Sequence, residues 1–466
     1  MSESLAHKSD VGPGGREVAC VVLICAIIIA LLHARHGPDA DNGVILDGAW
    51  DLVNGRRIYV DFFEFVPPGS FYLVYAVWKL LGVSYWSAKA LGCVALFVGA
   101  IGVHRIVCLV SREAARQTPT WVRVWIPALF CALSTRWPVI NHHTFSLVFA
   151  IWSAYCACLG LQRQNAVLMG IGGLLAGVSV WFIQFSGVAL AAGTGLAVLI
   201  VWLRDRQPVW LFNGAIFLVG AVAGASTLLM FWPVELLWEN LIAFPADRYM
   251  AINWVNPMPL ILAAVALILV GRLSRDRLSA PIIALIAVQG FLLASTVSRP
   301  GILHVSMIAF PFLCLLAPVL IPETTQAAMA RLWPAVAYAS LAAIVLTQPT
   351  VFPRRADFPF SSYIEHNCAD SPYLYAGPFL AGLHFETRKI NPTRYYTLLT
   401  GFNTEAQFAE ARADLARHRP QCIMVEYSGV VQFGYDRQNP VEAFIRQNYK
   451  TGAQFGTLEV LQRIDG

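Results

Sequence analysis

The sequence is short of charge. Only 13% of its 466 residues are Asp, Glu, Lys or Arg, whereas a soluble domain carries about a quarter. It has no block of Lys and Arg with interleaved aromatic residues, so we expect no binding to nucleic acid. The ten cysteines match no zinc or redox spacing, and no fixed-period repeat or low-complexity tract is present. These absences argue against a soluble enzyme, a nucleic-acid-binding protein and a repeat protein.

Apolar residues take the place of charge, at 57% of the chain. Runs long enough to cross a bilayer recur from Val18 to about Thr347, separated by short loops that contain arginine. The first run is followed by His-Ala-Arg-His-Gly-Pro, which is not a small-residue cleavage site, and this favours an uncleaved signal anchor with a cytoplasmic N-terminus. The sequence therefore predicts a polytopic α-helical membrane protein.

The distribution of arginine selects about eleven crossings. The predicted spans are 18–33, 86–110, 122–135, 143–161, 167–184, 185–203, 209–231, 258–271, 281–297, 305–321 and 333–347. The inner loops of this assignment contain Arg112, Arg116, Arg123, Arg163, Arg204, Arg206, Arg272, Arg275, Arg277 and Arg331. The short outer loops contain little more than Arg136, Arg248 and Arg299. This asymmetry agrees with the excess of positive charge that cytoplasmic loops carry.

One apolar segment, Pro67 to Gly82, is left out of the crossings. It begins at a Pro-Pro-Gly break and is too short for a comfortable span, and counting it would invert every later loop. An interfacial or re-entrant helix is the better interpretation. The first outer loop then covers residues 34–85, within a transmembrane domain of residues 1–347.

An odd number of crossings places the polar tail, residues 348–466, outside the cell membrane as well. We expect strands at 372–376, 422–427 and 457–464, and helices at 404–418 and 441–449, with Thr404 capping the first helix. A small C-terminal α/β extracytoplasmic domain is the predicted result. Cys368 and Cys422 are the two cysteines of this tail, and an oxidising compartment favours a disulfide between them.

Carboxylates gather in the first outer loop, with four between Asp39 and Asp51. Asp41 directly precedes a helical pattern, on which Asp47 and Asp51 share a face. Such groups at a membrane edge are costly unless they are solvated, paired or bound to a metal. A positioned Asp can accept the proton of an attacking hydroxyl group. For any one of them alone, hydration of the loop or helix capping is the simpler role.

The order of residues in this loop is distinctive. It runs Asp41-Asn42-Gly43, Gly55, Tyr59-x-Asp61-Phe62, Pro67-Pro68-Gly69-x-x-Tyr72-Leu73 and Leu80-Leu81-Gly82. This order resembles the first-loop signature of GT-C glycosyltransferases, in the bacterial branch related to protein O-mannosyltransferases and the lipid A aminoarabinose transferase. The resemblance implies a catalytic Asp at Asp41, a second acid at Asp61, interfacial helices before the second crossing, and a polyprenyl-phosphate sugar donor.

The chain departs from that family at two places. Many relatives have Glu where this chain has Asn42, which leaves a divalent metal open as a cofactor and its ligands unassigned. The aminoarabinose transferases have a basic residue where this chain has Val66, so contacts to the donor phosphate must come from elsewhere. The candidates are Lys89, Arg299, His304 and Arg248. Lys89 and Arg248 also suit anchors at the membrane interface.

Two further motifs have simpler interpretations. His142-His143 has no third metal ligand nearby in the sequence, which favours packing or hydrogen bonding. The segment Asn391 to Tyr395 resembles a turn in the outer domains of such enzymes, where it would position the domain, although a surface turn is slightly favoured.

The resemblance predicts a glycosyltransferase (EC 2.4 class) in a bacterial inner membrane, with a periplasmic C-terminal domain. Its partners would be membrane lipids, a polyprenyl-phosphate-linked sugar and a glycan, lipid or protein acceptor. A secondary transporter or lipid flippase is an alternative, but the membrane runs are nearly free of Asp, Glu and Lys at their centres and show no repeat. An enzyme of the O-antigen-ligase type is another, although such enzymes place their large outer loop between late spans. A non-catalytic assembly subunit also stays open.

Overall fold

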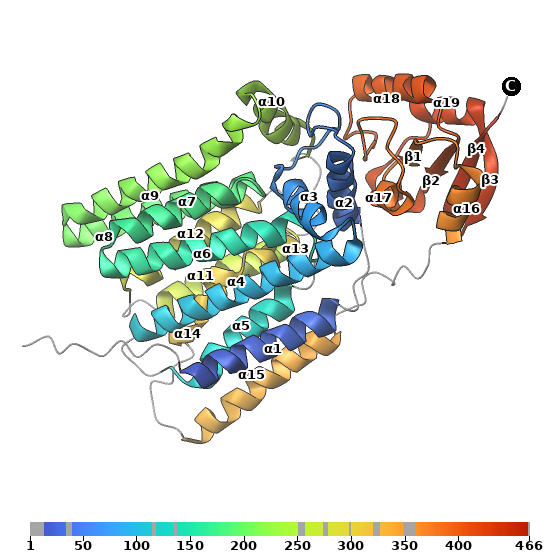
Figure 1. The fold of residues 1–466 in the computed structure, drawn as a ribbon. Helices are drawn as coiled ribbons and strands as arrows, with labels where there is room; N and C mark the ends of the chain where they lie inside the picture. Colours follow the sequence, from blue (N-terminus) through green and yellow to red (C-terminus); the bar gives the residue numbers. More distant parts are fainter. Residues whose placement is uncertain are drawn as a thin grey trace, which may run out of the picture.

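The computed structural model describes residues 14–33, 40–113, 118–134, 138–249, 257–273, 278–297, 300–319, 327–347 and 359–464. Most of these residues are helical. Figure 1 shows the long helices lying alongside one another, with a small unit of helices and strands at one end of the bundle.

Among the described residues, five helices are long and apolar enough to cross a membrane: α1 (Gly15–His33), α4 (Tyr85–Glu113), α6 (His142–Arg163), α8 (Gln184–Asp205) and α9 (Pro208–Ser226) with its continuation to Met230. Shorter apolar helices are α5 (Thr120–Ser134), α7 (Ala166–Ser179), α11 (Met258–Leu273), α12 (Ala280–Ser295) and α14 (Phe310–Val319), and α15 (Ala327–Thr347) has a shorter apolar part, Leu332–Thr347. Every predicted span overlaps one of these helices.

Close approach of glycines holds α7 against α9. A Cβ atom at Gly173 would lie 1.9 Å from the carbonyl oxygen of Phe217, and one at Gly177 would lie 2.2 Å from that of Ala221. Only glycine fits at such distances, and close backbone packing of this kind stabilises helix pairs in lipid. The opposite side of α9 is apolar and exposed, with Val219 at 65%, as a lipid-facing surface requires.

The segment Pro67 to Gly82 forms the short helix α3 (Gly69–Leu81), which packs against α2 (Ala40–Val53) at the end of the bundle nearest the strands. Phe71 and Val74 are buried on one face, while Leu80 and Leu81 are exposed at the C-terminal end. At 13 residues, α3 is shorter than a membrane crossing requires.

The strands form a four-stranded sheet in the order β1-β2-β4-β3. β1 (Leu374–Gly377) is parallel to β2 (Cys422–Val425), whereas β4 (Leu458–Arg463) is antiparallel to both β2 and β3 (Tyr449–Phe455). The accompanying helices are α16 (Pro359–Asn367), α17 (Leu383–Thr387), α18 (Glu405–His418) and α19 (Pro440–Asn448). The predicted strands β1, β2 and β4 and helices α18 and α19 are present, whereas β3, α16 and α17 were not foreseen.

Two local predictions for the tail are confirmed. Thr404 begins α18 with a capping box, because its side chain accepts from the backbone N–H of Gln407, whose side chain returns to the N–H of Thr404. Cys368 and Cys422 are joined in a disulfide, with their Cα atoms 5.8 Å apart.

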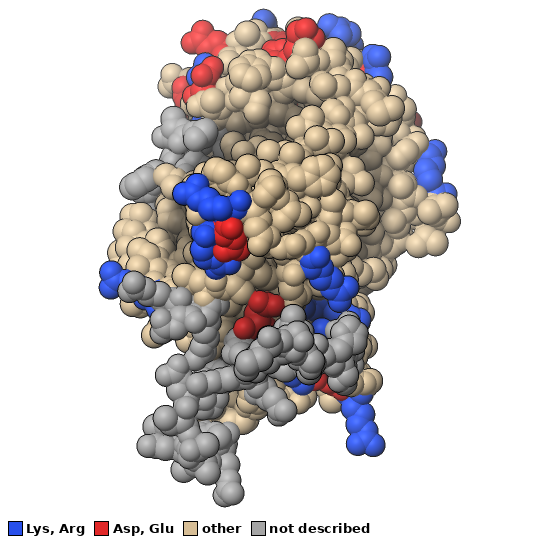
Figure 2. Space-filling view, turned by 90° about the vertical axis from the view of Figure 1, so that its left-hand side faces the viewer, with Lys and Arg blue, Asp and Glu red and all other residues tan. Residues whose placement is uncertain are grey.

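The two ends of the bundle differ in character. His142 and Gln184, which begin α6 and α8, line one cavity with the first loop, so Arg163 and Arg204 at the far ends of these helices lie away from it. Figure 2 views the end of the molecule opposite the strands and shows several Lys and Arg side chains across it.

Candidate functional site

The first loop and the strand-bearing unit meet backbone to backbone. A Cβ atom at Gly43 would lie 2.4 Å from the carbonyl carbon and oxygen of Ala381. Since any side chain there would collide with rigid backbone, the glycine of the Asp41-Asn42-Gly43 motif is explained by this contact rather than by chemistry.

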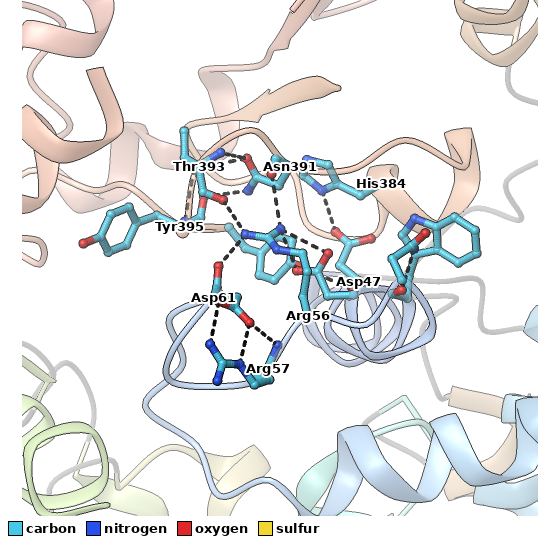
Figure 3. A network of polar contacts seen from close by, with 12 residues as sticks. Asp47, Arg56, Arg57, Asp61, His384, Asn391, Thr393 and Tyr395 are labelled. Carbon is cyan, nitrogen blue, oxygen red and sulfur yellow. Dashed lines mark hydrogen bonds and ion pairs between the residues drawn. The ribbon is translucent and has the colours of Figure 1, made fainter. Parts of the chain in front are cut away.

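Asp47 is the centre of this contact and is fully buried. Its carboxylate accepts hydrogen bonds from the backbone N–H groups of Gly382 (2.6 Å) and Phe385 (2.8 Å). The same carboxylate lies 3.0 Å from Nδ1 of His384, as Figure 3 shows. Nε2 of His384 is 3.1 Å from the carbonyl oxygen of Leu374, so both ring nitrogens face acceptors. This network ties α2 to α17 and β1.

A second connection runs through Arg56. Its guanidinium lies 3.0 Å from the buried carboxylate of Asp51 and donates to the carbonyl oxygens of Asn391 (3.2 Å) and Thr393 (3.4 Å). Burial raises the pKa of Asp51, although the charge of Arg56 opposes the shift. Asp47 and Asp51 therefore share a face, as the sequence predicted, and that face docks the C-terminal unit. The favoured interpretation of residues 391–395 as a surface turn is wrong, because Asn391 and Thr393 are buried in this contact.

Glu64 is a buried carboxyl group for which no role was predicted. Burial raises the pKa of Glu64 to about 8, and the charge of Asp47 adds to the shift. Its carboxyl group is thus protonated at neutral pH. An acid within an aromatic run, between Phe63 and Phe65, was the available signal for this environment.

The two predicted acids have different surroundings. Asp41 is half-buried in the first turn of α2. Asp61 is also partly exposed, and its carboxylate lies 3.0 Å from Nε of Arg57. The hydrogen bonds from Arg57 lower the pKa of Asp61. Two cavities lie beside the first loop, and neither Asp41 nor Asp61 is among the described residues that line them.

The first cavity, here called the inner cavity, has a volume of about 150 Å³ and lies where the first loop meets the ends of the long helices. Phe65, Val66 and Pro67 line it, together with His142, His143 and His304, the last from α13 (Ile302–Met307). The rings of His142 and His143 are 4.5 Å apart and those of His143 and His304 are 5.6 Å apart, measured between centroids. The structure thus gathers three histidines in the cavity that Val66 also lines.

The second cavity, here called the outer cleft, has a volume of about 690 Å³. It lies between the first loop, the segment Leu236 to Arg248 and the start of α18, and Arg248 lines it. Lys89 is buried in α4, with its ammonium 5.5 Å from the ring centroid of Tyr85 and 5.3 Å from that of Trp86. Arg299 lies outside the described residues. The proposed phosphate contacts His304 and Arg248 therefore belong to separate cavities.

The described residues of the first loop do not form a group of three possible metal ligands. Among the described residues, the one group with ligand atoms within 4.8 Å of one another is Glu17, His104 and Cys108. This group joins α1 to α4, and Arg123 donates to both oxygens of Glu17 (2.9 and 2.6 Å). The ion pair with Arg123 accounts for the buried Glu17 without a metal.

No family model and no curated protein matches the sequence. Among solved structures, the chain is similar to ArnT from Cupriavidus metallidurans bound to undecaprenyl phosphate, with a TM-score of 0.58 and 13% identity over 97% of this chain and 98% of that one. The apo state of the same protein matches with a TM-score of 0.58 and 14% identity over 96% and 98%. This chain has the ArnT fold. The likeness of fold extends over nearly the whole chain, helical bundle and C-terminal unit alike.

Proposed function

We propose that this chain is a glycosyltransferase of a bacterial inner membrane that moves a sugar from a polyprenyl phosphate to an acceptor hydroxyl on the outer face. The observation that carries the proposal is the fold, which matches that of ArnT across both the helical bundle and the C-terminal unit. The matching ArnT structure is bound to undecaprenyl phosphate. The first-loop signature and the cavity beside it support the same assignment.

The proposed topology has eleven crossings, a cytoplasmic N-terminus and α3 lying at the interface. Residues 1–347 form the transmembrane domain and residues 348–466 the periplasmic domain. Two observations support this. The first loop and the C-terminal unit are in contact, which requires one side of the membrane for both. The disulfide between Cys368 and Cys422 suits an oxidising compartment.

The inner cavity is the proposed site of the donor phosphate. Imidazole N–H groups are suitable donors to phosphate oxygens and can stabilise the charge that develops on the leaving group. His304 takes this role together with His142 and His143, which replaces the basic residue missing at Val66. Lys89 and Arg299 stay candidates for further phosphate contacts, whereas the position of Arg248 suits the acceptor side.

Asp41 is the proposed general base, and Asp61 the supporting acid. The acceptor oxygen attacks the anomeric carbon as Asp41 takes its proton, and the bond from that carbon to the phosphate oxygen breaks. Polyprenyl phosphate leaves with the electron pair, and the sugar is transferred with inversion. Asp61, held by Arg57, maintains the loop between α2 and α3. The acceptor class is a glycan, a lipid or a protein.

The test of the donor site uses purified protein and a panel of undecaprenyl-phosphate-linked hexoses and pentoses. Wild-type protein is expected to release undecaprenyl phosphate from one of them. His304→Ala should slow the release by roughly 100-fold, the effect of removing one donor to a developing negative charge. His366→Ala, on the exposed side of α16, is the matched control. Equal rates for His304→Ala and wild type would remove the inner cavity from the proposal.

A further inference from the structure

The outer cleft is a second cavity to which the donor chemistry assigns no role. It is more than four times the volume of the inner cavity. Its walls combine half-buried aromatic side chains, Phe63 and Phe244, with exposed carboxylates at Glu239 and Asp247. Apolar ring faces beside hydrogen-bonding carboxylates suit a sugar, which presents C–H groups on one face and hydroxyl groups at its edges.

The charge in the cleft distinguishes among acceptors. Its acidic residues are Glu239, Asp247 and Glu410, and its basic residues are Arg248 and Arg394. The guanidinium of Arg394 already has partners within the protein, because its Nη1 lies 3.5 Å from Glu410 and its Nη2 donates to the carbonyl oxygen of Tyr59. With Arg394 and Glu410 paired, Glu239 and Asp247 remain against Arg248, and the net charge of the cleft is negative. A phosphorylated or otherwise anionic acceptor is therefore disfavoured. A neutral sugar chain avoids this repulsion and accepts hydrogen bonds from Arg248 and donates them to the carboxylates.

A thin aromatic partition separates the cleft from the inner cavity. Phe63 lines the outer cleft and Phe65 lines the inner cavity, and the ring of Phe244 contacts both, at centroid distances of 4.8 and 5.8 Å. Phe402 lies against Phe65 and Phe244 at 5.6 and 5.5 Å. Phe244, which lines the outer cleft, therefore also contacts the lining of the inner cavity through Phe65.

The backbone that carries Phe244 is unusual. Two π-helical turns, Glu239–Ala243 and Pro245–Tyr249, flank it directly. Such turns are rare, have looser backbone hydrogen bonding than an α-helix and occur often at functional sites. The same segment supplies Glu239, Asp247 and Arg248 to the cleft, so an occupant of the cleft touches the element that holds the partition.

We propose that the outer cleft is the acceptor site and binds a chain of neutral sugars, with Phe244 as the partition that moves to bring the acceptor hydroxyl to the donor. The proposal rests on the function proposed above, because it assigns the second substrate of the same reaction. It narrows the acceptor from glycan, lipid or protein to an uncharged glycan.

The test uses oligosaccharides released from the envelope of the source organism and separated by anion exchange into a neutral and an anionic fraction. Purified protein receives radiolabelled undecaprenyl-phosphate sugar with each fraction. Two rates are measured: transfer of label to the fraction and release of free sugar by water, which needs only the donor site. Label is expected in the neutral fraction. Glu239→Gln and Asp247→Asn are expected to raise the KM for this fraction roughly tenfold each, as loss of a charge-assisted hydrogen bond does, with unchanged hydrolysis.

Glu235→Gln is the matched control, since Glu235 is exposed in the neighbouring helix α10 (Val234–Trp238) and does not line the cleft. It should behave as wild type. Label in the anionic fraction alone, or cleft variants with wild-type KM in a protein that transfers, would overturn the acceptor assignment and leave the proposed function standing. Wild-type protein that neither transfers nor hydrolyses any donor would overturn the proposed function and this inference with it.

Discussion

Replacing Asp47 by asparagine is expected to loosen the C-terminal unit from the first loop. The carboxylate of Asp47 is fully buried and accepts from the N–H groups of Gly382 and Phe385 while facing Nδ1 of His384. An asparagine side chain keeps one acceptor oxygen and presents an NH₂ group in place of the other. At least one buried donor then faces another donor.

The magnitude follows from the chemistry of these contacts. A hydrogen bond to a charged group contributes about 1.5–3 kcal/mol, and leaving a buried donor unsatisfied costs roughly 1–3 kcal/mol. Because asparagine retains part of the network, we expect a loss of roughly 2–4 kcal/mol in the docking of α17 onto α2. If the amides of residues 382 and 385 exchange by undocking, this loss accelerates their hydrogen exchange roughly 30- to 1000-fold.

Hydrogen exchange with mass spectrometry measures this directly in detergent-purified protein, in peptides that cover residues 381–387. The control is Asp205→Asn, which removes a carboxylate of an exposed pair with Arg204 and should leave these peptides unchanged. Exchange in Asp47→Asn that stays within threefold of wild type would refute the role of Asp47 as the docking centre.

Three further predictions concern stability. The pKa of Glu64 is raised from its usual 4.5 to about 8 on folding, so this group disfavours the folded state increasingly as the pH rises from 4.5 to 8. Glu64→Gln should therefore increase the free energy of unfolding more at pH 8 than at pH 5, by at most ~5 kcal/mol, and an equal increase at both pH values in thermal unfolding would contradict this. Gly173→Ala should destabilise the α7–α9 contact by roughly 2 kcal/mol or more, measured by thermal unfolding, whereas Gly195→Ala, with nothing within 4 Å of its added Cβ, should not. Cys368→Ser should cost about 4 kcal/mol because it opens a loop of 54 residues, and a peptide map under non-reducing conditions that shows Cys422 free in wild type would remove that expectation.

Local patterns were sufficient for much of the fold. Long apolar runs identified the helices of the bundle, and arginine distribution removed the segment of α3 from the crossings. In the tail, the apolar runs of β1 and β2 and the Thr404 cap identified their elements. β3 was not predicted because it is an edge strand that pairs with β4 alone, and Tyr449 is its one buried residue. A mostly polar strand has no hydrophobic pattern to detect.

The site was harder to predict because its parts are distant in the sequence. The face shared by Asp47 and Asp51 was visible, but its partners in the C-terminal unit lie more than 330 residues away. His142-His143 was interpreted as packing because no third ligand was near, and His304 joins them only through the fold. The prediction of Asp41 as the base rests on resemblance alone, and no local pattern separates it from its neighbouring carboxylates.

The central claim is tested most directly by transfer from undecaprenyl-phosphate sugars with wild-type protein, Asp41→Asn and Asp370→Asn, an exposed control in the C-terminal unit. Removal of the general base is expected to lower the rate of transfer by roughly 100-fold or more, with the fold and donor binding retained and the control at wild-type rate. A folded Asp41→Asn variant that transfers sugar at the wild-type rate would contradict the assignment of Asp41 as the base.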